Sequence, residues 1–155
     1  MEKKSILMIL IVVILVVTIG FLSFNQFTNS ENHVAVGDAT FILPEGFYKG
    51  TPNNSGDINI TNGYDTLFLK AYNDSNITKH AKEYSTNKHK QNNNSVVKFK
   101  NFTVGDVLVC KATVVNESST VHYWFDYHGK TYSIYTWSAS NKIDNIVTDL
   151  IKSIN

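Results

Sequence analysis

Residues 120–137 have the sequence TVHYWFDYHGKTYSIYTW, which is the clearest structural signal in the chain. Its two halves are rich in aromatic and β-branched residues, which favour β-strands. Gly129 supplies the positive φ that a two-residue turn demands, so His128-Gly129 predicts the turn of a β-hairpin. In this register Phe125 pairs with Tyr132, Tyr123 with Ile134 and Val121 with Thr136.

The predicted hairpin is aromatic on both faces. Successive residues of a strand point to opposite sides of the sheet, so one face forms the core and the other carries His122, Trp124, Tyr135 and Trp137. An exposed face of this kind can stack on a sugar ring or anchor a protein partner. The alternative is that the face packs beneath a helix. These four residues form our first candidate binding surface.

Apolar and polar residues alternate in other parts of the chain and predict further strands. In residues 66–72, alternation places Leu67, Leu69 and Ala71 on one face. Residues 95–99 and 106–115 alternate in the same way, and Gly105-Asp106 between them is typical of a turn.

Two helices are available to cover this sheet. Residues 141–154 have apolar side chains at helical spacing, and Ser140 is a suitable N-cap. A shorter pattern predicts a helix from Ile77 to about Lys88, with caps available in residues 74–76 and an end at the asparagine run 92–94. Strands interrupted by helices, without regular alternation of strand and crossover helix, predict an α+β domain in which an antiparallel β-sheet is flanked by helices.

The order of these elements resembles the PsbP-like fold, named for an extrinsic lumenal protein of photosystem II and shared by small bacterial and archaeal proteins. Residues 41–47 (FILPEGF) are similar to the opening strand and Pro-x-Gly-aromatic turn of that group. Residues 129–134 (GKTYSI) and the closing helix that ends in residues 151–154 also match, so the resemblance covers residues 38–154. It implies a non-enzymatic accessory or binding domain at a membrane surface.

The N-terminal segment predicts a membrane anchor. From Ile6 to Phe24 about 19 residues carry no charge, which at ~1.5 Å per residue approaches the thickness of a bilayer core. Lys3 and Lys4 precede this segment, and the positive-inside rule keeps them in the cytoplasm. We therefore expect cytoplasmic lysines and a transmembrane signal-anchor helix in residues 1–27, a tether in residues 28–37 and an extracytoplasmic domain in residues 38–155.

A cleaved secretory signal is the competing interpretation of the N-terminal segment. Such signals have a shorter apolar region followed by small residues at a cleavage site, whereas this segment ends Gly20-Phe21-Leu22-Ser23-Phe24. The sequence therefore favours a retained single-pass anchor in the cell membrane, with the C-terminal domain outside the cytoplasm. Both interpretations place that domain outside the cytoplasm.

Acceptor patterns for N-glycosylation are consistent with an extracytoplasmic domain. Biased codon usage in an Asn-rich chain is the alternative explanation for their number. The candidate sites are Asn53, Asn59, Asn73, Asn76, Asn93, Asn101 and Asn116.

Composition excludes several classes of protein. The chain has 155 residues, enough for one domain, and a net charge of +1, so strong attraction to a polyanion is not expected. All of its basic residues are lysines, which removes the planar guanidinium that nucleic-acid recognition usually exploits. Cys110 is the sole cysteine and lies in an apolar strand pattern, so we expect it to be a core residue and not part of a disulfide.

A locally basic stretch forms a second candidate surface. Between residues 79 and 100 six lysines face only one acidic residue, Glu83. They could contact anionic lipid headgroups or an acidic envelope polymer, and the alternative is a solvated helix and loop. The residues taken as candidates are Lys79, Lys82, Lys88 and Lys90.

Motifs for catalysis are not found in the sequence. His122 and His128 are six strand residues, roughly 20 Å, apart, too far to share one metal ion. No serine lies in a nucleophile-elbow pattern, and no glycine-rich phosphate loop occurs. We therefore predict no catalytic, cofactor-binding or metal-binding residues and a non-catalytic binding or accessory domain for a membrane protein or an envelope polymer. The alternative is a hydrolase of a cell-envelope polymer, which would need a cleft with converging carboxylates or a Ser/His pair.

Overall fold

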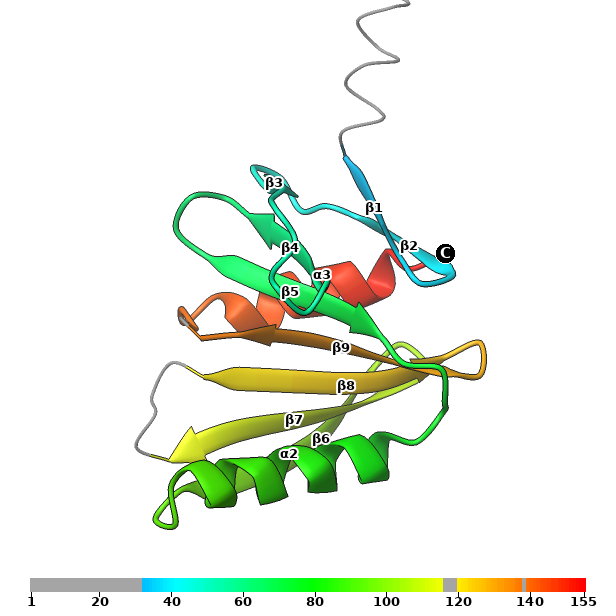
Figure 1. Cartoon of the computed structure of the whole chain (residues 1–155). Helices are drawn as coiled ribbons and strands as arrows, with labels where there is room; N and C mark the ends of the chain where they lie inside the picture. Colours follow the sequence, from blue (N-terminus) through cyan, green and yellow to red (C-terminus); the bar gives the residue numbers. More distant parts are fainter. Residues whose placement is uncertain (1–31, 116–119, 138) are drawn as a thin grey trace, which may run out of the picture.

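The computed structural model describes residues 32–115, 120–137 and 139–155 and has an α+β fold (Figure 1). Within these residues a small sheet pairs β1 with β2, and a seven-stranded sheet has the order β3-β4-β5-β9-β8-β7-β6. Every neighbouring pair is antiparallel. The strands are β1 (His33–Val36), β2 (Ala39–Ile42), β3 (Tyr48–Lys49), β4 (Ile58–Thr61), β5 (Thr66–Ala71), β6 (Val96–Val104), β7 (Val107–Val115), β8 (Val121–Tyr127) and β9 (Lys130–Thr136), and the helices are α2 (Ile77–Gln91) and α3 (Ile143–Lys152).

The central hairpin has the register that its sequence predicts. β8 and β9 pair Phe125 with Tyr132, Tyr123 with Ile134 and Val121 with Thr136. Both residues of the turn have positive φ, 47° at His128 and 77° at Gly129, as a type I′ turn requires. The predicted strands in residues 66–72, 95–99 and 106–115 are also confirmed as β5, β6 and β7.

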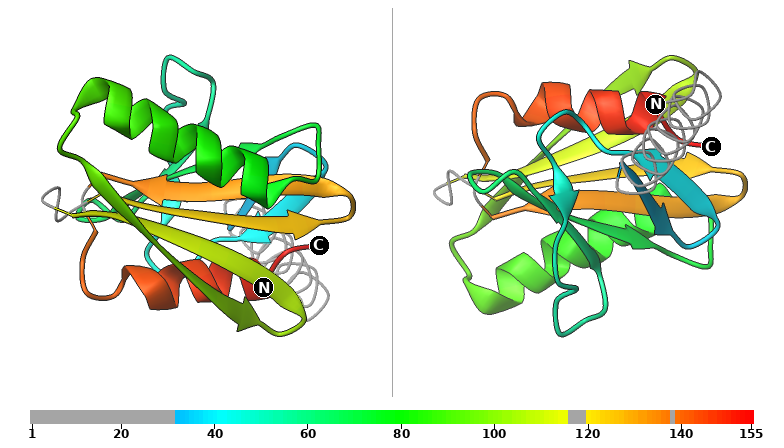
Figure 2. Two further views of the ribbon diagram at one scale, coloured as in Figure 1. Left: turned by 90° about the horizontal axis from the view of Figure 1, so that it is seen from below. Right: turned by 90° about the horizontal axis from the view of Figure 1, so that it is seen from above.

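The helices lie on opposite faces of the large sheet, as Figure 2 shows from two directions. On one face, α3 and the β1–β2 hairpin enclose the main core, which includes Leu67, Tyr123, Phe125 and Ile134, all essentially without exposed surface. On the other face, α2 packs on β7 and β8, where Ala81, Cys110, Ala112 and Trp124 form a smaller core. Cys110 is buried there as a free thiol, in agreement with the expectation of a core cysteine.

Helix α2 begins and ends where polar side chains favour it. The Asn76 side chain accepts a hydrogen bond from the backbone N–H of Lys79 and so caps the first turn. The helix ends at Gln91, three residues beyond the predicted end near Lys88 and immediately before the asparagine run that was expected to stop it.

Helix α3 is shorter than its sequence pattern predicts. It begins at Ile143, after Lys142 in the N-cap position, and the predicted cap Ser140 instead accepts a bond from the Lys142 backbone N–H at 3.3 Å. The apolar stripe is nevertheless buried: Ile143, Val147, Leu150 and Ile151.

The folded domain begins earlier than the expected boundary at residue 38. Strand β1 starts at His33, and Val34 and Val36 lie in the core, so residues 33–37 belong to the domain and not to a tether. The period-2 pattern in residues 33–36 is too short to distinguish from a linker without the partner strand β2. The predicted membrane helix and the start of the predicted tether, residues 28–31, lie outside the described residues. Among the residues that the structure describes, no helix is long and apolar enough to cross a membrane.

Candidate binding groove beside helix α2

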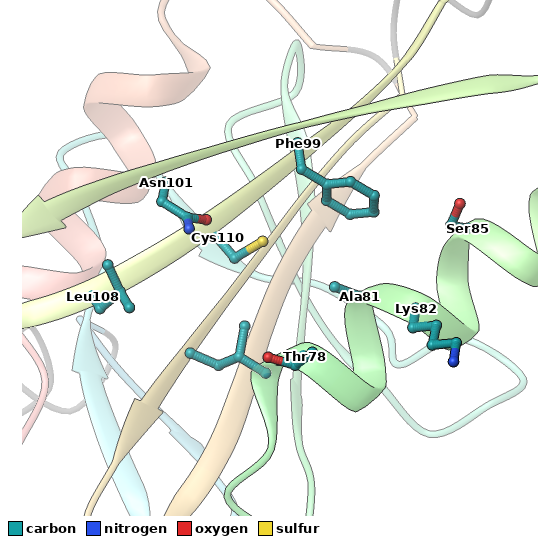
Figure 3. A pocket seen from close by; sticks show the side chains of 9 residues that line it. Thr78, Ala81, Lys82, Ser85, Phe99, Asn101, Leu108 and Cys110 are labelled. Carbon is teal, nitrogen blue, oxygen red and sulfur yellow. The ribbon is translucent and has the colours of Figure 1, made fainter.

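An open, mainly apolar groove of about 440 Å³ lies between α2 and the β6–β7 edge of the sheet. We call it the α2 groove. Figure 3 shows the side chains of Phe99 and Cys110 directed from the strands toward the helix. The residues that line the groove are Ile77, Thr78, Ala81, Lys82 and Ser85 on α2 and Phe99, Asn101, Leu108 and Cys110 on the strands.

The strands place these residues together because of their register. Phe99 pairs with Ala112, and Asn101 pairs with Cys110, so their side chains share the face that α2 covers. Helix α2 lies over β8 and leaves the edge strands only partly covered. As a result Phe99 is 46% exposed and Leu108 52% exposed although both are large apolar residues.

The chemistry of the groove is unsuited to nucleophilic catalysis. Burial raises the pKa of the Cys110 thiol, so the reactive thiolate is disfavoured. Among the described residues, the lining includes no histidine and no carboxylate that could activate Cys110 or Ser85. What the groove offers is apolar surface and a lysine, Lys82, at its rim.

The four lysines predicted as a basic surface all lie on α2, but their surroundings differ. Lys79 donates a hydrogen bond to Asp74 at 2.8 Å, and this bond raises the pKa of Lys79. Lys82 borders the α2 groove, Lys90 is exposed near the end of the helix, and Lys88 lies 6.0 Å from the centre of the Tyr84 ring.

The predicted aromatic surface is divided by helix α2. Trp124 is only 1% exposed and packs beneath the helix, so it belongs to the core and cannot contact a ligand. Trp137 is 56% exposed and lies 4.6 Å from the Phe68 ring. His122 and Tyr135 are half-buried between these two. The sequence could not reveal this division, because the position of α2 across the sheet depends on tertiary packing.

His122 is held neutral by its surroundings. Its ring stacks on Trp124 at 3.9 Å and on Tyr135 at 5.0 Å, and among the described residues its buried Nε2 has no hydrogen-bond partner. Burial, with smaller contributions from the charges of Lys70 and His80, lowers the pKa of His122 to about 3. A histidine with this pKa does not serve as a general base that becomes protonated near neutral pH.

A buried carboxylate ties the loop before β4 to the sheet. Asp57 accepts hydrogen bonds from the Tyr135 hydroxyl at 2.6 Å and from the Asn53 amide at 3.2 Å. Burial, followed by the bond to Asp57, raises the pKa of Tyr135. These groups satisfy one another, which is typical of a structural network.

The candidate glycosylation sites differ in access. The amide nitrogen of Asn53 is already a donor to Asp57 and Tyr135, and the side-chain oxygen of Asn59 is buried. Asn116 lies outside the described residues. Glycosylation stays a prediction, and the exposed candidates are Asn73, Asn76, Asn93 and Asn101.

The residues that line the α2 groove were not among the sequence candidates, apart from Lys82 and the acceptor site Asn101. The available signal was that residues 107–110 are apolar without a break, which indicates a strand with apolar side chains on both faces. In the part of the chain that the structure describes, no three His, Cys, Asp or Glu side chains are grouped to hold a metal ion.

Comparison with known proteins bears on the fold. No family model matches the chain, and no curated protein matches its sequence. The solution structure of cyanobacterial PsbP (CyanoP) from Synechocystis sp. PCC 6803 is similar, with a TM-score of 0.50 and 8% sequence identity over 79% of this chain and 90% of that chain. Similarity at this level of identity shows the fold alone. The domain therefore has a PsbP-like fold.

Proposed function

We propose that this chain is a non-catalytic binding domain, an accessory module that is anchored at a membrane outside the cytoplasm and that binds a protein partner in the α2 groove. The observation that carries the proposal is the pair of exposed apolar side chains, Phe99 and Leu108, on the sheet side of the groove. Covering a Phe or Leu side chain completely is worth ~1.5–3 kcal/mol, so a partner that fills the groove gains affinity there.

The composition of the groove favours binding over hydrolysis of an envelope polymer. A hydrolase needs a nucleophile with a base, or a pair of carboxylates, at the reacting bond. The described lining offers the Cys110 thiol and the Ser85 hydroxyl with no histidine or carboxylate beside them. No observation in the described residues favours the hydrolase, and we do not propose it.

The proposed location rests on the sequence. The uncharged segment from Ile6 to Phe24 is long enough to span a bilayer, and Lys3 and Lys4 before it set the orientation. A direct test uses Tyr64→Cys in a Cys110→Ser background, because Tyr64 is 92% exposed. A membrane-impermeant maleimide should label this variant in intact cells, and the labelled chain should sediment with membranes. Labelling only after lysis would refute the location.

The binding proposal is tested by photo-cross-linking in living cells. A benzoylphenylalanine residue replaces Leu108 at the groove or, as the matched control, Tyr64 in the turn before β5. We expect the groove position to form an adduct with one membrane or envelope protein at a defined mass, and the control position to form none. Equal adducts from both positions, or no protein adduct from the groove, would refute the proposal.

A further inference from the structure

Strand β6 is an unusually open edge of the sheet. It is the last strand in the order β3-β4-β5-β9-β8-β7-β6, and among the described residues nothing pairs with its outer side. It is nine residues long, and most of its side chains are exposed. The opposite edge is β3, which has only two residues. Short edge strands protect a sheet from further pairing, whereas long open ones are templates for an added strand.

The turn between β6 and β7 determines which backbone groups face outward. Val104 and Val107 flank the two-residue turn Gly105-Asp106, and Gly105 has a φ of 58°. Residues that flank a two-residue turn bond to each other, and the bonding pairs alternate from there. The backbone groups of Phe99 and Asn101 therefore point away from β7 and toward solvent. The side chains of these two residues line the α2 groove, so the outward backbone hydrogen-bonding groups lie next to the apolar surface of the groove.

Charge on β6 favours a partner of opposite sign. Lys98 and Lys100 project from the face opposite to Phe99 and Asn101, both are exposed, and neither forms an ion pair among the described residues. Lys100 stands directly opposite Lys111, whose ammonium is already bound to Asp144 at 2.6 Å. Like charges directly opposite each other in a sheet are destabilising. The Asp144 carboxylate already offsets part of this repulsion, because the charges of Lys111 and Lys100 both favour its ionised form. An acidic neighbour on the free side of Lys100 would offset more of it.

We propose that β6 accepts an extended acidic segment of a partner protein as an additional strand. This inference rests on the proposed function and specifies the partner. The side chains of an added strand point alternately to the two faces of the sheet, so the segment alternates acidic with apolar residues. Its carboxylates lie beside Lys98 and Lys100, and its apolar side chains lie beside Phe99 at the mouth of the α2 groove.

A second copy of this chain fits the same edge less well. Two β6 strands paired antiparallel about a twofold axis would bring Lys98 and Lys100 of both copies onto one face, with no acidic residue in β6 to separate them. The charges on β6 therefore favour pairing with a strand of another protein that carries acidic residues.

The test compares two peptides and two edge variants, using the full chain purified in a mild detergent. The probes are a fluorescent nine-residue peptide of alternating glutamate and leucine and its counterpart with lysine in place of glutamate. Asn101→Pro removes an outward N–H without removing a bond to β7, and Asn101→Ala keeps that N–H. By fluorescence anisotropy the acidic peptide should bind the wild type at least tenfold more tightly than the basic peptide. Asn101→Ala should bind like the wild type, and Asn101→Pro at least tenfold more weakly.

Charge reversal supplies an independent comparison. Lys98→Glu with Lys100→Glu should weaken binding of the acidic peptide at least tenfold, whereas Lys49→Glu on the opposite edge strand should leave it unchanged. Should Asn101→Pro not fold, hydrogen exchange on the wild type gives the answer. The amides of Phe99 and Asn101 should gain protection when the acidic peptide binds, and no gain there would overturn the proposal.

Several outcomes would overturn strand addition. These are equal binding of both peptides, unchanged binding by Asn101→Pro, or dimers of the chain alone that Asn101→Pro dissociates, because such dimers would assign the edge to a second copy. Cross-linking from position 108 in cells separates this inference from the proposed function. If the adduct survives Asn101→Pro, the groove binds a partner without strand addition. If no adduct forms even in the wild type, the proposed function itself fails.

Discussion

Lowering the pH from 7 to 5 should cost the domain about 2 kcal/mol of unfolding free energy at His122 alone. The folded state keeps this side chain neutral down to a pKa of about 3, whereas the ordinary pKa of a free histidine is 6.5. The unfolded chain therefore binds a proton below pH 6.5 that the folded chain does not bind. Stability from this group is fully present above pH 6.5 and is lost as the pH falls from there toward 3.

The magnitude follows from the two pKa values. pH 5 lies about 1.5 units below the pKa of the unfolded histidine, and each unit lowers the free energy of unfolding by ~1.36 kcal/mol. The expected loss is therefore about 2 kcal/mol. His122→Phe removes the titrating group but keeps a ring that can stack on Trp124 and Tyr135. It also removes a buried nitrogen that has no partner among the described residues, so the variant should be at least as stable as the wild type at pH 7.

The assay is urea unfolding of residues 32–155, followed by tryptophan fluorescence at pH 7, 6 and 5. The loss of unfolding free energy between pH 7 and 5 should be smaller in His122→Phe than in the wild type by about 2 kcal/mol. His89→Phe, at an exposed position on α2, controls for the loss of a histidine. Equal losses in the wild type and His122→Phe would show that His122 does not cause the loss of stability.

Three further predictions concern packing and backbone geometry, and urea unfolding checks each. Trp124→Ala should destabilise the domain by about 3–5 kcal/mol because Trp124 is fully buried, whereas Trp137→Ala, at an exposed ring, should cost about 1 kcal/mol or less; similar losses would contradict the division of the aromatic face. Asn76→Ala should cost about 1 kcal/mol by removing the helix cap, and an unchanged stability would argue against that cap. Gly37→Val should cost more than about 1 kcal/mol, since Gly37 has a φ of 61° and an added Cβ would lie 2.7 Å from the Ala71 Cβ; a neutral effect would contradict this geometry.

The elements that sequence reasoning predicted well are those defined by local chemistry. The hairpin in residues 120–137 combines a glycine turn with strand-forming residues on both sides, and its register follows from the turn. The apolar stripe of α3 is also a local pattern and was predicted correctly. The start of the helix was not, because Ser140 does not cap it as its sequence position suggests. Strand β1 was mistaken for a tether because its pairing with β2 and its burial are tertiary effects.

The candidate site was less predictable for the same reason. Trp124 and Trp137 lie on the same predicted face of the hairpin, and the sequence does not show which of them is buried. The placement of α2 buries Trp124 and leaves Trp137 exposed. The α2 groove exists because α2 lies mainly over β8 and covers the edge strands only in part, which leaves Phe99 and Leu108 about half exposed. No local pattern specifies how far a helix reaches across a sheet.

Binding through the α2 groove can be measured as the amount of partner that co-purifies with groove variants from cross-linked, intact cells. Phe99→Ser with Leu108→Ser removes the two exposed apolar side chains of the groove, and Tyr64→Ser is the control for an exposed aromatic residue elsewhere. We expect the double variant to recover at least tenfold less of a single membrane or envelope protein, since the two side chains together contribute about 2 kcal/mol or more to binding. We expect the control to recover as much as the wild type. Equal recovery by the double variant and the control would contradict binding through the groove.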